Sequence, residues 1–339
     1  MSSNKYIRSI CYFSDNPTAE LKDKLDQLSK KLEDKKYVVQ TKRICTSGIG
    51  AKELDGIFND PSLYLSLGSL SLNEAQNRLD GVLNTPNTLF NIDLTHEKIE
   101  QEHVGILFDI IKSNASKTFN FTYVFNNAPS SPFMPSASYE RNGFSIGLQA
   151  TDLADGCSSI SEWLDASKSA WEEITEMFQN DPDFLGIDSS VAPLFEGKSS
   201  FINFLRRLGF DFPQSTTTAI YTEITKYLKE QNPKPVGLCG LMFPCLEDFE
   251  LAEEYEKGEF SLERNIYLSL HSGLGIDTYP IGIDENPMRV VGILTLLQNL
   301  SNKYKKPLSC RFVSDGKAKI GDNTDFQNQY LKDVVVRGL

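Results

Sequence analysis

The strongest constraint on the fold is the alternation of strand-like and helix-like segments along nearly the whole chain. Residues 6–13 (YIRSICYF) alternate and are rich in β-formers, whereas residues 18–34 carry leucines at the spacing of an amphipathic helix. The segment 119–125 (FNFTYVF) is the clearest strand signal, and residues 288–305 repeat the helical spacing. This alternation predicts an α/β protein, in which helices cover a sheet or barrel.

The length of 339 residues fits either one large α/β domain or two domains of ordinary size. No internal repeat, low-complexity tract or long Pro- or Ser-rich linker interrupts the alternation of segments. We therefore expect a single domain over residues 1–339.

Composition and charge exclude several classes of protein. Hydrophobic residues make up 40% and charged residues 24%, which is typical of a globular protein rather than a disordered or fibrous one. A net charge of −12 repels phosphate backbones and anionic lipids, so we expect neither nucleic acid nor a membrane as a partner. The first residues form no apolar segment, so we expect no secretory signal, and the six scattered cysteines fit reduced thiols. These features favour a cytoplasmic location.

Standard catalytic signatures are absent from the sequence. It contains no dinucleotide-binding glycine motif, no phosphate-binding P-loop and no Gly-x-Ser-x-Gly elbow. Cys239 and Cys245 do not have the spacing of a zinc site or a redox pair, and three histidines are too few for a histidine-rich metal site. A candidate site must therefore be sought in loops rather than in a known motif.

Five loops place short polar residues at the end of a predicted strand or the start of a predicted helix, where α/β folds bind ligands. They are residues 130–136, 186–193, 214–219, 272–285 and 321–326. The first would wall a pocket with apolar side chains, and the third would hold an anion with hydroxyls and helix N–H groups. The last two carry carboxylates suited to a cation or to acid–base chemistry. Each loop, taken alone, is equally compatible with a turn or a helix cap.

The ordered set of loops resembles the family known as domain of unknown function 711. The matching segments are residues 132–134, 188–193, 215–218, 236–244, 275–281 and 321–326. The resemblance implies one roughly ten-stranded α/β barrel with helices outside, similar to the barrel of pyruvate formate-lyase-like glycyl radical enzymes. We expect no glycyl radical, because residues 336–339 (VRGL) lack the aromatic context of the radical glycine.

Two hypotheses about function follow. The first is an enzyme acting on a small anionic metabolite in a polar barrel pocket, by hydrolase- or lyase-type chemistry, with or without a divalent cation. Its catalytic carboxylates would be Asp188, Asp277, Asp322 and Asp325. Its substrate contacts would come from Phe133, Met134, Ser189, Thr216, Thr217, Thr218, His271 and Arg311. The second hypothesis is a non-catalytic small-molecule-binding or regulatory protein that uses the same pocket. A homodimer is compatible with either.

Overall fold

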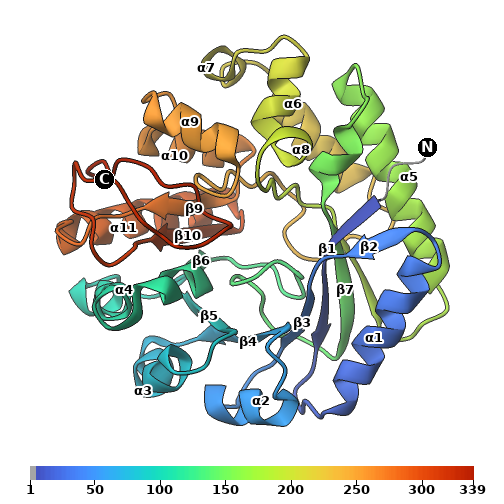
Figure 1. Cartoon of the computed structure of the whole chain (residues 1–339), viewed down its shortest axis with the longest axis horizontal. Coiled ribbons are helices and arrows are strands. Elements are labelled where there is room, and N and C mark those ends of the chain that lie inside the picture. Colours follow the sequence, from blue (N-terminus) through green and yellow to red (C-terminus); the bar gives the residue numbers. More distant parts are fainter. Residues whose placement is uncertain (1–4) are drawn as a thin grey trace.

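A ten-stranded mixed sheet forms the centre of the molecule in the computed structural model, which describes residues 5–339 (Figure 1). The strands run in the spatial order β8-β7-β1-β3-β4-β5-β6-β10-β9, and β2 pairs with β1. Their bounds are β1 (Lys5–Phe13), β2 (Tyr37–Val39), β3 (Lys42–Cys45), β4 (Leu63–Leu70), β5 (Thr88–Asp93), β6 (Phe121–Phe125), β7 (Gly143–Leu148), β8 (Phe184–Asp188), β9 (Gly275–Pro280) and β10 (Leu308–Val313).

Strand direction divides the sheet into a central parallel group and two flanking pairs. Strands β1, β3, β4, β5 and β6 are parallel to their neighbours in the group. The pair β7–β8 is internally parallel but antiparallel to β1, and the pair β9–β10 is internally parallel but antiparallel to β6. Figure 1 shows the strands in an arc with the helices on its outer side.

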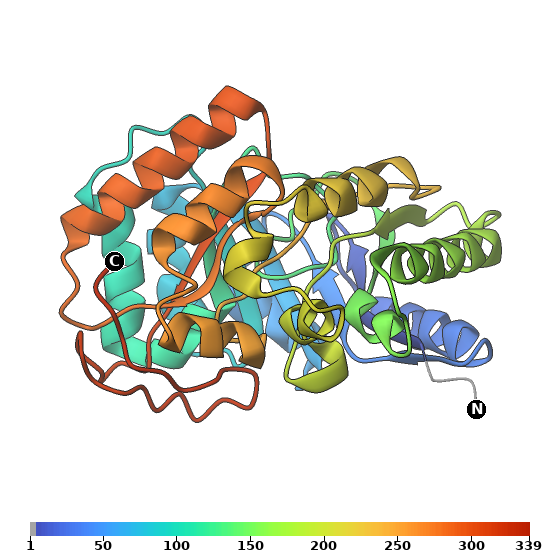
Figure 2. The same ribbon diagram turned by 90° about the horizontal axis from the view of Figure 1, so that it is seen from above.

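Eleven α-helices are assigned within residues 5–339, and most lie outside the sheet in both views (Figures 1 and 2). They are α1 (Glu20–Glu33), α2 (Ala51–Phe58), α3 (Leu72–Leu83), α4 (Gln101–Asn114), α5 (Ile160–Phe178), α6 (Phe201–Arg207), α7 (Phe212–Ser215), α8 (Ile220–Glu230), α9 (Phe249–Glu256), α10 (Leu262–His271) and α11 (Pro287–Tyr304). In this described part of the chain, none has both the length and the apolar character that a membrane crossing requires.

An irregular segment, residues 235–248, lies between the two edge strands β8 and β9. We call it the closing segment. Isolated bridges connect it to both sides: Ile187–Pro235, Val191–Leu241, Leu241–Gly273 and Pro244–Asp277. The predicted α/β fold class, with ten strands and helices outside, is therefore confirmed. The expected barrel is not closed by a continuous ladder, because single bridges through the closing segment link the edges of the sheet.

The two faces of the strands differ because successive side chains point to opposite sides. Ile44 of β3 and Ile92 of β5 belong to the large apolar cluster that includes the helices. Their neighbours Arg43 and Asn91 are polar yet buried. The inner face of the sheet therefore carries some polar side chains. Buried polar side chains need hydrogen-bond partners, because burial removes them from water.

Residues 126–142, between β6 and β7, supply part of those partners. We call this segment the central loop, because it runs inside the arc of strands (Figure 1). Nδ2 of Asn91 donates to the carbonyl oxygens of Pro135 and Ala137, at 2.9 and 3.0 Å. A Cβ atom on Gly147 of β7 would lie 2.7 Å from the ring of Phe133. Only glycine leaves room there for the loop to pack against the strand.

The predicted element boundaries are mostly close to those observed, with one instructive difference. The predicted strand 119–125 begins only at Phe121, because Ala115–Asn120 forms a 3-10 turn that carries Phe119 and Asn120 to the edge of the sheet. Phe119 packs beneath a guanidinium group there instead of continuing the strand.

Candidate functional site

Two adjoining cavities lie inside the arc of strands. We call the first the loop lobe, because Phe133–Ser136 of the central loop and part of the closing segment line it. The second is the tyrosine lobe, lined by Tyr64 and Tyr330 among others. Their empty volumes, including the open mouths, are about 630 and 470 Å³. Five residues line both lobes: Arg8, Arg43, Met134, Glu247 and Arg311.

The tyrosine lobe lies at the amino ends of the parallel strands. Arg43, Tyr64 and Leu89 are each the second residue of their strands, β3, β4 and β5, and all three line the lobe. Open α/β sheets usually bind ligands at the carboxyl ends of their strands. The tyrosine lobe is therefore at the opposite end of the central parallel group.

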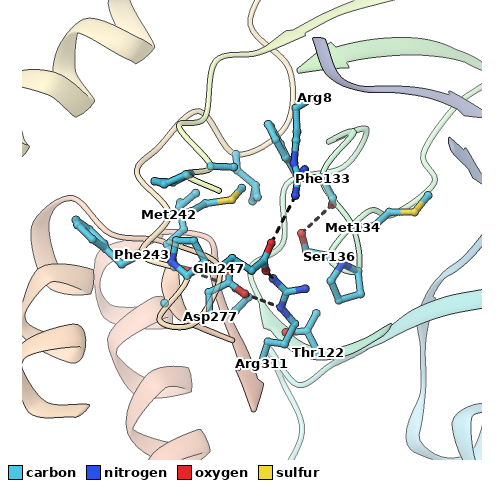
Figure 3. A pocket seen from close by; sticks show the side chains of 18 of the residues that line it. Arg8, Thr122, Phe133, Met134, Ser136, Met242, Phe243, Glu247, Asp277 and Arg311 are labelled. Atoms are coloured by element: carbon cyan, nitrogen blue, oxygen red, sulfur yellow. Dashed lines mark hydrogen bonds and ion pairs between the residues drawn. The ribbon is translucent and has the colours of Figure 1, made fainter. Parts of the chain in front are cut away.

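An ion cluster forms one wall of the pocket (Figure 3). Nε of Arg311 donates to Asp277 at 2.6 Å, and its Nη2 donates to Glu247. Arg8 reaches the other oxygen of Glu247 at 3.5 Å. The guanidinium of Arg311 also lies 5.0 Å from the centre of the Phe119 ring. Arg311 is thus fixed by two carboxylates and an aromatic face, and their negative charges raise its pKa although burial alone would lower it.

Arg43 is buried in a different way. Its Nε donates to Thr41 at 3.1 Å and its Nη1 to the carbonyl oxygen of Pro132 at 3.2 Å, while its guanidinium lies 5.7 Å from the centre of the Tyr64 ring. Among residues 5–339 it forms no ion pair with a carboxylate. Burial, and next the nearby charge of Arg8, lower its pKa to about 10. Arg43 is therefore a buried cation without an anionic partner in the described chain.

The charges around the pocket do not balance. Three guanidinium groups and two carboxylates line the lobes, although the whole chain has a net charge of −12. Burial raises the pKa of Glu247 against the opposing effect of Arg311. A negatively charged ligand would reduce this imbalance.

Four of the residues predicted from the sequence line the loop lobe. They are Phe133, Met134, Asp277 and Arg311, from the central loop, β9 and β10. The structure thus brings together residues that are up to 178 positions apart along the chain.

Asp188 does not line either lobe. It is fully buried at the end of β8, where its carboxylate accepts hydrogen bonds at 2.6–3.0 Å. The donors are the hydroxyls of Ser131 and Ser190 and the backbone N–H groups of Ser190, Leu238 and Cys239. This set joins β8 to the central loop and the closing segment, so Asp188 has a structural environment. The adjacent Ser189 donates to the carbonyl oxygen of Leu228 and also lies outside the lobes.

The threonines at 216–218 do not form the anion cradle that the sequence suggested. The hydroxyls of Thr216, Thr217 and Thr218 donate to carbonyl oxygens three residues earlier, at 2.8, 3.1 and 2.7 Å. They follow the short outer helix α7 and do not line the pocket. The three hydroxyls therefore give hydrogen bonds to backbone carbonyl oxygens at the end of that turn. This is a common role of threonine at such positions.

The other three predicted residues also lie away from the pocket. His271 is at the end of α10, where its Nδ1 is 2.8 Å from the hydroxyl of Ser272. Asp322 and Asp325 are exposed in the segment that follows β10. Asp322 accepts from the N–H of Lys319, as a turn carboxylate does. The predicted carboxylates are therefore not assembled into one constellation.

Three charged residues of the pocket were not predicted from the sequence: Arg8, Arg43 and Glu247. Each carried a signal in the sequence, since Arg8 and Arg43 interrupt strand-like segments and Glu247 follows the apolar run 241–246 (LMFPCL). A charged residue within a buried strand needs a partner or a function. The pattern of polar residues at loop ends does not include these three residues, because they lie within or beside strands.

The carboxylates of the pocket offer little to a metal ion. Asp277 and Glu247 both bind Arg311. No group of three or more His, Cys, Asp or Glu side chains placed to hold a metal is found anywhere in residues 5–339. The arrangement is better suited to binding an anion through guanidinium N–H groups.

Comparison with known families gives one match. The model of a family described as "Uncharacterised ACR (DUF711)" matches residues 71–328, about three quarters of the chain. No curated protein matches the sequence. The matched range includes the central loop, Glu247, Asp277 and Arg311, whereas Arg8, Arg43 and Tyr330 lie outside it.

Proposed function

The chain belongs to the DUF711 family, and from its pocket we propose that it binds a small anionic metabolite inside the barrel and acts on it as an enzyme. The observation that carries the proposal is Arg43, a buried guanidinium at the junction of two cavities with no carboxylate partner in residues 5–339. A cation of this kind is costly to bury unless an anion joins it.

The geometry of Arg43 supports anion binding rather than a purely structural role. Two of its nitrogens hold Thr41 and Pro132, and the aromatic face of Tyr64 lies against it. These contacts fix the plane of the guanidinium while leaving Nη2 without an acceptor among the described residues. A guanidinium with a fixed plane binds a carboxylate or phosphate in a defined orientation. Arg8, which borders the same lobes, would share the negative charge.

Glu247 is the residue that we assign to chemistry. It lies between Arg8 and Arg311, and burial raises its pKa. A raised pKa makes a carboxyl group easier to protonate, and a carboxyl group that exchanges a proton with its ligand can act as a general acid or base. Asp277, on the other side of Arg311, would hold that guanidinium in place during the proton transfer.

A non-catalytic binding protein is the second candidate. The observation in its favour is that both pocket carboxylates are already bonded to Arg311, an arrangement that also serves to hold the pocket in shape. The two candidates share the anion site and differ only in the role of Glu247.

Anion binding is tested by calorimetry and thermal-shift measurements with phosphate, acetate, malonate and pyruvate. At least one anion should raise the melting temperature of the wild-type protein, since a ligand that binds only the folded state stabilises it. Arg43→Gln should weaken that binding by roughly tenfold to a hundredfold, the usual size of a charge-assisted hydrogen bond. Arg264→Gln, which removes a surface ion pair with Glu259, is the control and should bind normally.

Two results would refute the proposal: no response to any of the anions, or equal binding by the Arg43 and Arg264 variants. To separate the two candidates, the protein is incubated with metabolite mixtures and followed by NMR. Turnover that is lost in Glu247→Gln while anion binding persists supports the enzyme. Binding without turnover in the wild type supports the binding protein.

A further inference from the structure

The loop lobe has two kinds of wall. The arginines and the ion cluster lie on the strand side, whereas apolar residues line the rest (Figure 3). The apolar residues come from the central loop, the closing segment and two short neighbouring stretches: Phe133, Met134, Pro135, Ala192, Pro193, Leu238, Met242, Phe243, Pro244 and Leu274. In Figure 3, Met242 and Phe243 lie on one side of the cavity and Phe133 and Met134 on the other.

The polar groups of this lobe, apart from Arg8 and Arg43, are already engaged. The hydroxyls of Thr122, Ser136 and Ser309 donate to the backbone carbonyl oxygens of Tyr123, Phe133 and Leu274, respectively, at 3.1–3.3 Å. Asp277 and Glu247 bind Arg311. A sugar or another polyol would therefore meet few donors beyond the two arginines.

The apolar walls are also tightly supported from behind. A Cβ on Gly147 would lie 2.7 Å from the ring of Phe133, and a Cβ on Gly240 would lie 2.8 Å from the side chain of Leu274. Both walls therefore rest directly on backbone and have little room to move outward. The apolar part of the lobe therefore has a fixed size, which limits the length of the group that it can hold.

We propose that the ligand of this pocket combines one anionic head group, held by Arg43 and Arg8, with a short unbranched or branched hydrocarbon group that fills the apolar part of the loop lobe. This inference rests on the proposed function, since it takes the anion site as given, and it adds the substrate class. Sugar phosphates and polycarboxylates are disfavoured, because their additional polar groups would lose water against an apolar wall without gaining partners.

The test is a series of sodium alkyl carboxylates from acetate to hexanoate, and a parallel series of alkyl phosphates, each measured by calorimetry. Affinity should rise with chain length by up to roughly fourfold per methylene, the value for burying a CH₂ group, until the lobe is full. The series with the tighter-binding first member identifies the head group. Lactate and glycerate, which add hydroxyls to propionate, should bind less tightly than propionate.

Met242→Gln keeps the length of a side chain in the wall but makes it polar, and should flatten the dependence of affinity on chain length, measured relative to acetate in the same variant. Met242→Leu should restore the dependence. Met288→Gln, at an exposed position of α11 that is 55% accessible and outside the pocket, is the matched control and should behave as the wild type. Thermal unfolding of each variant verifies that it is folded.

The outcomes separate the two proposals. Anion binding without any gain from added methylenes, or with tighter binding of glycerate than of propionate, overturns this inference and leaves the anion site standing. No binding of any member of either series overturns both.

Discussion

Asp188 and Arg43 are both charged residues buried inside the arc of strands, but their surroundings differ completely. The carboxylate of Asp188 accepts five hydrogen bonds from the central loop, the closing segment and its own strand, and it has no access to either cavity. The guanidinium of Arg43 has two acceptors, an aromatic neighbour and an open side facing the cavities.

The difference shows that a buried charge is not evidence of a binding site. A group whose hydrogen-bonding capacity is filled by the protein contributes to the fold, because a ligand would have to displace good partners. A group that is buried but incompletely satisfied can gain by binding a ligand. We therefore expect Asp188 to contribute to the stability of the fold and Arg43 to contribute to ligand binding.

The largest effect is expected at Asp188. Asp188→Ala should lower the free energy of unfolding by about 4 kcal/mol, because several buried donors lose their acceptor at once. Urea denaturation measures this directly. Asp322→Ala, at an exposed turn, should change it by less than about 0.5 kcal/mol. If Asp188→Ala costs less than the control, the structural assignment of Asp188 is wrong.

Arg311→Met should lower the free energy of unfolding by about 3 kcal/mol at pH 8, because the buried Glu247 and the partly buried Asp277 would lose their shared cation. The loss should shrink as the pH falls. Glu247 has a raised pKa in the folded state and an ordinary one when unfolded, so the folded state binds more protons between the two values. The contribution of protonated Glu247 to the free energy of unfolding is therefore largest below its unfolded-state pKa. This contribution is lost as the pH rises through its folded-state pKa.

Urea denaturation of Arg311→Met at pH 5.5 and pH 8 measures this dependence. Arg264→Met, at a partly exposed ion pair, should cost less than about 1 kcal/mol at both pH values. An equal loss at the two pH values for Arg311→Met would show that Glu247 does not take up a proton.

Arg43→Met should leave the free energy of unfolding unchanged or raise it by about 1 kcal/mol, since it removes a buried charge without stranding a charged partner and loses only the hydrogen bonds to Thr41 and Pro132. The melting temperature should at the same time stop responding to anions. Chemical denaturation measures the free energy of unfolding, and thermal-shift measurements test the response of the melting temperature to anions. A loss of stability comparable to that of Asp188→Ala would place Arg43 among the structural residues.

The smallest effect is expected at Thr217, whose hydroxyl only caps its own turn. Thr217→Ala should change the free energy of unfolding by less than about 0.5 kcal/mol and leave anion affinity unchanged. Loss of phosphate binding in this variant would move the anion site from the barrel to the outer helices.

The sequence predicted part of the site for physical reasons that can be traced. Asp277 and Arg311 belong to strands with recognisable patterns, and Phe133 and Met134 lie in a proline-stiffened loop, so residue type and local context indicated a pocket. Asp322, Asp325 and the three threonines had equally suitable local contexts but lie on outer turns. A polar turn looks the same in sequence whether it faces a cavity or solvent, because its hydrogen bonds are local.

Arg8, Arg43 and Glu247 illustrate what local patterns miss. Each strand alternates between two faces, and only the pairing of distant strands determines which face is enclosed. Cys11 of β1 aligns with Arg43 of β3, and Glu247 is brought beside Arg311 by the closing segment. These contacts join residues far apart in the chain, so no window of sequence contains them.

The sequence by itself determined the α/β class, most of the strands and helices, and the family, because apolar periodicity and ordered motifs are properties of the chain. Only the tertiary structure decided which charges share a cavity and which are satisfied by backbone donors. The physical reason is that desolvation and Coulomb energy depend on distances in space, and these arise from strand pairing and from the central loop entering the arc of strands.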